Sequence, residues 1–285
     1  MSNHLLIKDI FHETNICGLA SLRRNISAPN RTPAPASVAE QQLCGGGVMS
    51  GKLYAIGVGP GASDLITVRG ARTLAQLDVL YTPAGKADAQ SLAHRIVAEY
   101  LSPNTEIRTY HFLMKAEQAR KEAVWDRVAD AMQREVAQGK QVGFITLGDA
   151  MLFSTWVSLL ARIGHQPWLE IIPGVTSFAA IAASSAMPLA MENQTLTVLS
   201  CTSPESELEQ ALRTHDCAVL MKVYGRFATI RSLLGRMGLL DHAIMMSDAT
   251  LPTQQCWYHL DECDRQLELP YFSTILVNKN WNASR

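Results

Sequence analysis

The sequence carries almost no net charge. Its 285 residues include 25 Lys and Arg against 26 Asp and Glu, so the formal net charge is −1, and charged residues make up only 18% of the chain. Proteins that bind nucleic acid or anionic membranes usually show a clear basic excess, because contacts to phosphate groups supply much of their affinity. The sequence therefore disfavours both kinds of partner. Any anion that the protein binds has to meet a local group of positive charges.

Long hydrophobic runs are also missing. The apolar stretches, such as those within 218–223 and 273–277, are far shorter than the about 20 residues that a membrane-spanning helix needs. Residues 1–48 lack the apolar core of a secretion signal. We therefore expect a protein that is neither embedded in a membrane nor secreted.

Paired cysteines are the third absence. The six cysteines form no C-x-x-C motif, and several lie within apolar segments, where a free thiol behaves as a small hydrophobic group. His259 and Cys263 are four residues apart, but local packing explains this spacing better than metal ligation. The sequence thus predicts a protein of the reducing cytoplasm with no metal site of its own.

The apolar residues, in contrast, make up 47% of the chain, which is enough for a sizeable core, and the length suggests two domains. Residues 1–48 are rich in Ser, Asn, Pro and Ala with little periodicity, so we expect a disordered extension. Gly45–Gly47 implies G-rich codons like those of a ribosome-binding site, and our hypothesis is that translation starts at Met49. The expected ordered domains are 49–168 and 169–285.

From residue 52 onward, short apolar runs alternate with segments of helical periodicity, which is typical of α/β architecture with largely parallel sheets. A first helix is expected with Ser63 or Asp64 as its N-cap, and further helices are expected to begin near Pro204 and Arg226. The sequence predicts strands after residue 52 and at 79–81, 106–111, 141–146, 196–200, 219–223, 243–246 and 274–278, a joint between the halves at 170–177, and a terminal antiparallel pair of 256–260 with 272–278.

The most informative motif is the glycine-rich loop 57–61, Gly-Val-Gly-Pro-Gly, between a predicted strand and a predicted helix. Glycine has no Cβ, so such a loop lets the backbone approach a ligand closely. Its first two glycines and Ala62 also fit a loose dinucleotide fingerprint. However, the proline removes an N–H donor that a pyrophosphate would use, and Asp78 precedes the next apolar run instead of following it. A nicotinamide oxidoreductase and a tight turn without a ligand remain rival hypotheses.

Two further loops, 147–155 and 173–177, also stand where ligands bind in open α/β sheets, at the carboxyl ends of predicted strands. The first contains a glycine, a carboxylate and hydroxyl groups, and the second leads into a helix N-terminus rich in N–H donors. Each alone is also explained as a turn with a helix cap. Together, the three loops indicate one shared crevice.

With these motifs in this order, residues 52–281 resemble the tetrapyrrole methylases, the two-domain class of S-adenosylmethionine-dependent methyltransferases that serve cobalamin and sirohaem synthesis. Most members carry Gly-Asp-Pro where this chain has Gly148, Asp149 and Ala150. That departure resembles the C(20)-methyltransferase branch, as do the following segments 151–155, 221–226 and 271–277. The resemblance implies the class III methyltransferase fold, with an active site in the cleft between two α/β domains, and a homodimer.

The resemblance also implies which residues contact the cofactor S-adenosylmethionine. Physically, Asp149 can accept a hydrogen bond from an ammonium or a ribose hydroxyl, and N–H donors near Ser177 can hold a carboxylate. The implied cofactor-binding residues are Pro60, Leu147, Gly148, Asp149, Met151, Ser154, Thr155, Thr176, Ser177, Phe178, Lys222, Tyr224, Ala249 and Thr250.

The implied reaction is methyl transfer to C(20) of cobalt-factor II (cobalt-precorrin-2), with metal-free precorrin-2 or an RNA base as the alternative acceptor. Cobalt then arrives within the substrate. A base has to remove the C(20) proton, and Asp64 is a candidate, although an N-cap role explains that residue as well. Since the substrate is a polycarboxylate, basic residues near the predicted loops are expected to bind it: Arg69, Lys86, Lys115 and Arg226.

Overall fold

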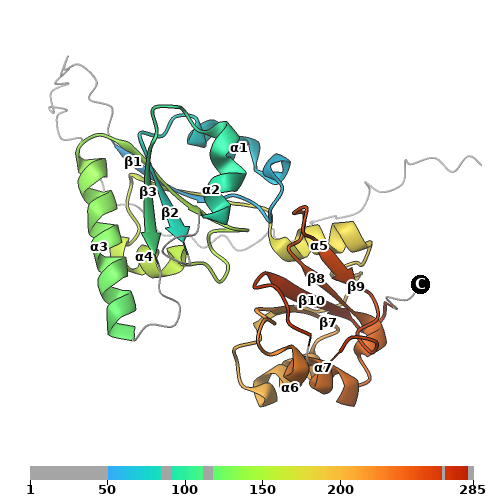
Figure 1. Ribbon diagram of the computed structural model, residues 1–285. Coiled ribbons are helices and arrows are strands. Elements are labelled where there is room, and N and C mark those ends of the chain that lie inside the picture. The colour runs from blue at the N-terminus through green and yellow to red at the C-terminus, as the bar shows by residue number, and fades with distance from the viewer. Residues whose placement is uncertain (1–50, 85–90, 112–117, 265–266, 282–285) are drawn as a thin grey trace, which may run out of the picture. The chain divides into compact units, whose positions relative to one another are not determined.

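The computed structural model describes residues 51–84, 91–111, 118–264 and 267–281, which form two five-stranded sheets with helices on their faces (Figure 1). The predicted disordered extension 1–48, as well as Lys86 and Lys115, lies outside the described residues. No helix in the described part of the chain is long and apolar enough to span a membrane.

The first sheet is parallel throughout, with the strand order β3-β2-β4-β1-β5. Side chains alternate between its two faces. On β1, Leu53 and Ala55 pack in the core under α3 and α4, whereas Ile56 packs in the core under α1 and α2. The elements are β1 (Lys52–Gly57), α1 (Val68–Leu74), β2 (Val79–Ala84), α2 (Leu92–Val97), β3 (Glu106–His111), α3 (Gln118–Ala137), β4 (Gln141–Thr146), α4 (Trp156–Ile163) and β5 (Leu169–Ile172).

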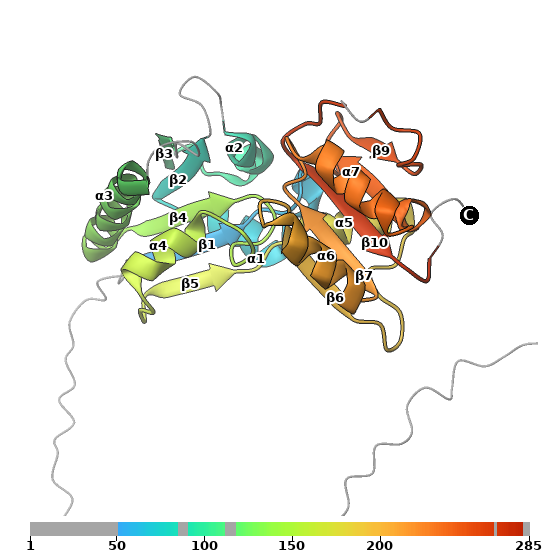
Figure 2. The same ribbon diagram turned by 90° about the horizontal axis from the view of Figure 1, so that it is seen from below.

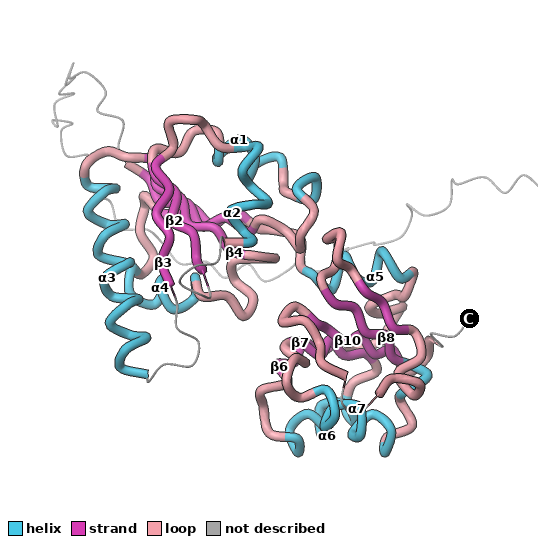
Figure 3. Tube along the Cα trace, viewed as in Figure 1, coloured by secondary structure: helices cyan, strands magenta, loops and turns pink. Residues whose placement is uncertain are grey.

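The second sheet is mixed, with the order β6-β7-β10-β8-β9, and only its β6–β7 pair is parallel. One face packs against α6 and α7 through Leu208 and Ile230, and the other packs against α5 through Ile181 (Figures 2 and 3). The elements are α5 (Ser177–Ser185), β6 (Leu196–Ser200), α6 (Glu205–Thr214), β7 (Cys217–Met221), α7 (Phe227–Arg236), β8 (Ala243–Ser247), β9 (Gln255–Trp257) and β10 (Ser273–Asn278).

Three details of the predicted secondary structure are wrong. Segment 169–172, expected to begin the second half, is β5 and pairs with β1, so the first sheet extends past the predicted boundary at residue 168. The expected antiparallel pair is also different, because β9 pairs with β8 while β10 lies between β7 and β8. Finally, residues 63–65 form a 3₁₀ turn, and α1 is capped by Thr67, whose Oγ1 accepts a hydrogen bond from the N–H of Gly70.

Candidate functional site

Three glycines from three loops touch one another at the carboxyl ends of neighbouring strands. Gly57 ends β1, Gly148 follows β4 and Gly174 follows β5, and β1 lies between the other two strands. A Cβ on Gly57 would lie 2.6 Å from the Gly174 nitrogen and 2.7 Å from the Gly148 oxygen. A Cβ on Gly174 would lie only 2.1 Å from that oxygen. The structure therefore brings together the three loops that the sequence predicted to converge, and glycine is what allows this contact.

The first two loops are also joined by backbone hydrogen bonds. Gly59 donates to the Gly148 oxygen at 3.2 Å, and Gly148 donates to the Gly59 oxygen at 2.7 Å. Both glycines have positive φ, +81° and +67°, a conformation that other residues adopt only with strain. Pro60 follows Gly59 directly and is partly buried.

Asp149 ties the third loop to the second. Its Oδ2 accepts a hydrogen bond from the Gly174 N–H and its Oδ1 accepts one from the Met151 N–H, both at 2.9 Å. The sequence predicted this carboxylate as a ligand-binding group and did not indicate the structural bonds. Each carboxylate oxygen keeps acceptor capacity beyond them, so the residue can serve both purposes.

The loop after β8 contacts the glycine-rich loop from the other half of the chain. Thr250 Oγ1 accepts a hydrogen bond from the Ala62 N–H at 2.9 Å. A Cβ on Gly61 would lie 2.9 Å from both the Ala249 oxygen and Thr250 Oγ1. Ala249 and Thr250, both predicted site residues, are thus placed against the first loop.

This contact gives a first testable expectation. Replacing Thr250 with Ala leaves the Ala62 N–H without its partner, and we expect the free energy of unfolding to fall by about 1 kcal/mol, as for a typical hydrogen bond. Urea titration of wild type and variant measures the difference. Thr253→Ala, which removes the hydrogen bond from Thr253 to Asp248, is a control on the same loop. If the Thr250→Ala variant is as stable as wild type, the hydrogen bond from Ala62 to Thr250 does not contribute to stability.

Several non-glycine residues near these loops have positive φ. They are Phe153 (+48°), Lys222 (+60°), Asp248 (+49°) and Thr250 (+68°), four of the six such residues in the described part of the chain. Such conformations cost free energy and are concentrated at functional sites. Lys222 Nζ also lies 5.3 Å from the centre of the Phe153 ring, which is cation–π distance.

An exposed aromatic cluster of Tyr224, Tyr271 and Phe272 lies at the end of the second sheet. The sequence reasoning assigned Tyr224 to the cofactor site but did not assign Tyr271 or Phe272 to any site. The ring centres of Tyr224 and Tyr271 are 6.0 Å apart, and those of Tyr271 and Phe272 are 5.0 Å apart. These side chains are 54%, 52% and 42% exposed. Two adjacent aromatic residues directly before a buried strand were the available signal, because large apolar groups at such a position rarely stay exposed without a reason.

Buried hydroxyl groups hold the aromatic turn in place. Ser273 Oγ donates to the Pro270 oxygen at 2.6 Å and accepts from Ser247 Oγ, also at 2.6 Å. The Asp248 N–H donates to the Phe272 oxygen at 3.0 Å. The turn that carries Tyr271 and Phe272 is therefore fixed to the loop that carries Thr250.

The other predicted cofactor residues lie on the same loops and at helix starts. Thr176 is the N-cap residue of α5, and its side chain makes no capping hydrogen bond, so N–H groups of the first turn, at Ser177 and Phe178, remain available. Ser154 is used internally: its Oγ donates to Thr146 Oγ1 and accepts from the Trp156 N–H. Thr155 is the N-cap residue of α4, and Leu147 packs against the core under α1 and α2.

Two of the four predicted substrate-binding residues, Arg69 and Arg226, lie in the described part of the chain, and both contact other groups of the protein. Arg226 Nη1 donates to the carbonyl oxygens of Cys201 and Ser203, both at 2.7 Å, and Arg69 forms an exposed ion pair with Glu170 at 3.5 Å. Burial raises the pKa of the Cys201 thiol to about 12, although Arg226 opposes the shift, so this cysteine stays neutral.

Asp64 is exposed within the 3₁₀ turn and caps no helix. The described residues contain no group of three or more His, Cys, Asp and Glu side chains that could hold a metal ion. Cys263 Sγ donates to the His259 carbonyl oxygen at 3.5 Å, a local contact within one turn.

The comparisons with known proteins agree with this geometry. The family model of the Tetrapyrrole (Corrin/Porphyrin) Methylases matches residues 52–262. The chain belongs to this family. A cobalt-precorrin-2 C(20)-methyltransferase of Salmonella typhimurium is 64% identical over 82% of this chain and 98% of its own length. A precorrin-2 C(20)-methyltransferase of a Sinorhizobium species is 30% identical over 81% of this chain and 96% of its own length.

The fold of this tetrapyrrole methylase is shared by a solved uroporphyrin-III C-methyltransferase from Thermus thermophilus in complex with S-adenosylhomocysteine. That structure has a TM-score of 0.58 and 20% identity, and covers 82% of this chain and 93% of the other. The predicted α/β fold of the tetrapyrrole methylases, the class III methyltransferases, is therefore confirmed.

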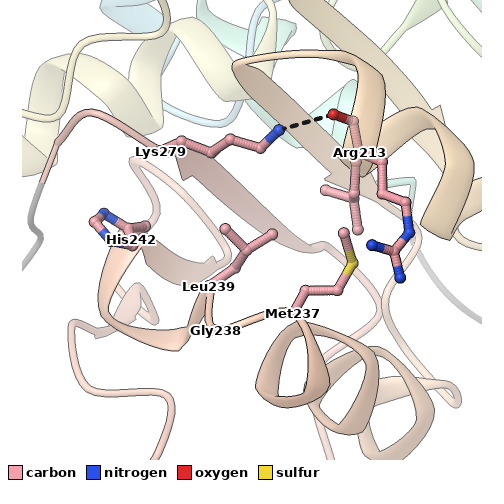
Figure 4. A pocket seen from close by; sticks show the side chains of 7 residues that line it. Arg213, Met237, Gly238, Leu239, His242 and Lys279 are labelled. Carbon is pink, nitrogen blue, oxygen red and sulfur yellow. Dashed lines mark hydrogen bonds between the residues drawn. The ribbon is translucent and has the colours of Figure 1, made fainter.

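A hollow of about 440 Å³ lies in the second half of the chain, near the C-terminal ends of α6 and α7 (Figure 4). Its polar groups are satisfied by the protein: Lys279 Nζ donates to the Arg213 oxygen at 3.3 Å, and His242 Nδ1 lies 2.9 Å from the Trp281 oxygen. Arg213 is paired with Glu209. Basic side chains at helix C-terminal ends stabilise the helices themselves, which explains this group.

Proposed function

We propose that this protein transfers the methyl group of S-adenosylmethionine to C(20) of cobalt-precorrin-2. The observation that carries the proposal is the 64% identity, over nearly the whole relative, to a protein named for that reaction. The relative named for metal-free precorrin-2 is only 30% identical. We therefore propose cobalt-precorrin-2 as the substrate in place of metal-free precorrin-2, and a tetrapyrrole in place of an RNA base.

The residues around the three-glycine junction fit the cofactor. When bound, S-adenosylmethionine supplies a methyl group already activated by a positively charged sulfur. Gly57, Gly148 and Gly174 let the backbone come close to a ligand, and Asp149 keeps acceptor capacity for an ammonium or hydroxyl group. The first turn of α5 offers N–H donors to a carboxylate. Because the methyl donor is already activated, the main task of these residues is to hold both reactants in line.

The exposed aromatic cluster fits the other reactant. Tyr224, Tyr271 and Phe272 present exposed rings tilted by 55° and 86° to one another, and a flat conjugated macrocycle can pack against their faces and edges. C(20) loses its proton after methylation, and we propose Asp64, which caps no helix, as a candidate base. We further propose a site between two α/β domains, a homodimer and a cytoplasmic location, as the family resemblance implies.

An anoxic assay with labelled S-adenosylmethionine tests the proposed reaction. We expect methyl transfer to cobalt-precorrin-2 with a kcat/KM at least about tenfold above that for precorrin-2, a difference of ~1.4 kcal/mol in transition-state stabilisation. Mass spectrometry locates the added methyl group at C(20). An excess of activity toward precorrin-2 would reassign the substrate. Absence of transfer to both, with protein shown to be folded, would refute the proposed function.

A further inference from the structure

Lys222 stands directly after β7 and makes no ion pair with any residue in the described ranges. Its side chain is exposed and its backbone has φ +60°, a conformation that costs free energy in any residue except glycine. In the described part of the chain, this charge contacts the ring of Phe153, at the candidate site. The position therefore calls for a functional explanation.

Phe153 fixes the place of the Lys222 ammonium group. The ring belongs to the loop after β4, the lysine to the loop after β7, and Nζ lies 5.3 Å from the ring centre. Phe153 is itself 45% exposed and has φ +48°. A cation–π contact uses the face of the ring and leaves the other N–H donors of the ammonium group free. The pair thus presents a positioned positive charge at the candidate site.

The two other basic residues predicted near the site that the structure describes, Arg226 and Arg69, contact other groups of the protein. Arg226 donates to two carbonyl oxygens, and Arg69 is paired with Glu170. In contrast, Lys222 precedes Tyr224 by two residues, and Tyr224 belongs to the exposed aromatic cluster. A flat ring packed against Tyr224 would bring the carboxylates of its edge toward Lys222, which belongs to the same loop.

We propose that Lys222, positioned by Phe153, binds a peripheral carboxylate of the tetrapyrrole and not the cofactor. The inference rests on the proposed function, since it needs a polycarboxylate ring as substrate. An ammonium group on a carboxylate forms a charge-assisted hydrogen bond, which is stronger than a neutral one. This assignment moves Lys222 from the cofactor residues that the family resemblance implied to the substrate residues.

Two substitutions separate a role in binding from a role in the fold. Lys222→Gln removes the charge, and Lys222→Gly removes both the charge and the backbone strain, so the glycine variant should be at least as stable as wild type. In both variants we expect KM for cobalt-precorrin-2 to rise about tenfold, in line with the loss of one charge-assisted hydrogen bond. The dissociation constant of S-adenosylhomocysteine, measured by calorimetry, should change less than about twofold. The free energy that a twofold change represents is well below the contribution of one hydrogen bond.

Further variants serve as controls. Lys222→Arg keeps the charge and should restore most of the affinity for the tetrapyrrole. Lys52→Gln removes an exposed lysine at the opposite, amino end of β1 and should change neither constant. Phe153→Leu should raise KM by a smaller factor, and the double variant with Lys222→Gln should be no worse than Lys222→Gln alone, because the two side chains act together.

Absorbance titration of the tetrapyrrole in the presence of S-adenosylhomocysteine gives a second measurement that needs no turnover. Weaker binding of cobalt-precorrin-2 by Lys222→Gly, with unchanged binding by Lys52→Gln, supports the proposal. Equal tetrapyrrole binding by wild type and Lys222→Gly, or a loss confined to S-adenosylhomocysteine, overturns it. A wild-type protein that binds the tetrapyrrole but transfers no methyl group would refute the proposed reaction and leave the binding role of Lys222 decided by the titration.

Discussion

Replacing Gly174 with Ala is expected to abolish cofactor binding and to destabilise the protein. The added Cβ would lie 2.1 Å from the Gly148 oxygen and 2.6 Å from the Gly57 carbonyl carbon, and all of these atoms belong to backbone. Backbone cannot move aside as a flexible side chain can, so the loops have to separate. We expect the free energy of unfolding to fall by about 3 kcal/mol, the upper end of the range for overpacking.

Activity should fall as well in this variant. Separation of the loops breaks the hydrogen bond from the Gly174 N–H to Asp149 and disturbs the surface that we propose for the cofactor. We expect kcat/KM to drop by more than about 100-fold, because misplacement of reacting groups by 1 Å can have that effect. Radiolabelled methyl transfer and urea unfolding measure the two quantities.

Gly235→Ala is a matched control for the Gly174 substitution. This glycine lies in α7, and its added Cβ would be 3.5 Å from the nearest atom, an ordinary contact. Alanine should stabilise the helix by up to about 1 kcal/mol and leave activity unchanged. An active, stable Gly174→Ala variant would show that the three-glycine contact does not shape the site.

Replacing Asp149 with Ala is expected to weaken the binding of S-adenosylhomocysteine by about 100-fold. Two effects combine. The substitution removes the acceptor that we propose for the ligand, and it leaves the N–H groups of Met151 and Gly174 without their partner. Hydrogen bonds to a charged group contribute about 1.5–3 kcal/mol each, so the loss of even one such contact to the ligand accounts for a large part of the change.

The Asp149→Asn variant separates the loss of the proposed acceptor for the ligand from the loss of the hydrogen bonds to Met151 and Gly174. The asparagine side chain has one carbonyl oxygen, so it can accept from either Gly174 or Met151 but not from both with the same geometry. We expect an affinity between those of wild type and Asp149→Ala, measured by isothermal titration calorimetry. Unchanged affinity in the alanine variant would remove Asp149 from the cofactor site and leave it a purely structural residue.

Much of the fold could be predicted from the sequence because strand and helix periodicities were clear. β4, β6, α6 and α7 lie close to where the pattern placed them. β5 was missed because four residues are too few to show a period, and the following Pro173-Gly174 indicated a turn. The position of β10 between β7 and β8 could not be predicted, since strand order depends on contacts far apart in the sequence.

The convergence of the three loops could be predicted because ligand loops of parallel sheets gather at the carboxyl ends of the strands. The hydrogen bonds within and between these loops could not be predicted. Nothing in the sequence distinguishes an Asp149 that binds a ligand from one that binds its neighbours' N–H groups, or an Arg226 that binds carbonyl oxygens from a free one. The positive φ of Phe153 and Lys222 could not be predicted either, because only glycine and asparagine indicate positive φ in a sequence.

The central place of β10 has a consequence for synthesis on the ribosome. The first sheet is complete in sequence at residue 172, whereas the second lacks its middle strand until 273–278 have been made. Until then the edge of β7 that faces away from β6, and the edge of β8 that faces away from β9, have no neighbour, and open edges of this kind invite pairing with other chains. The nascent second half is thus exposed to aggregation for the roughly 3 to 11 s that translation of residues 222–278 takes. It gains protection only when its last strand enters between two strands already made.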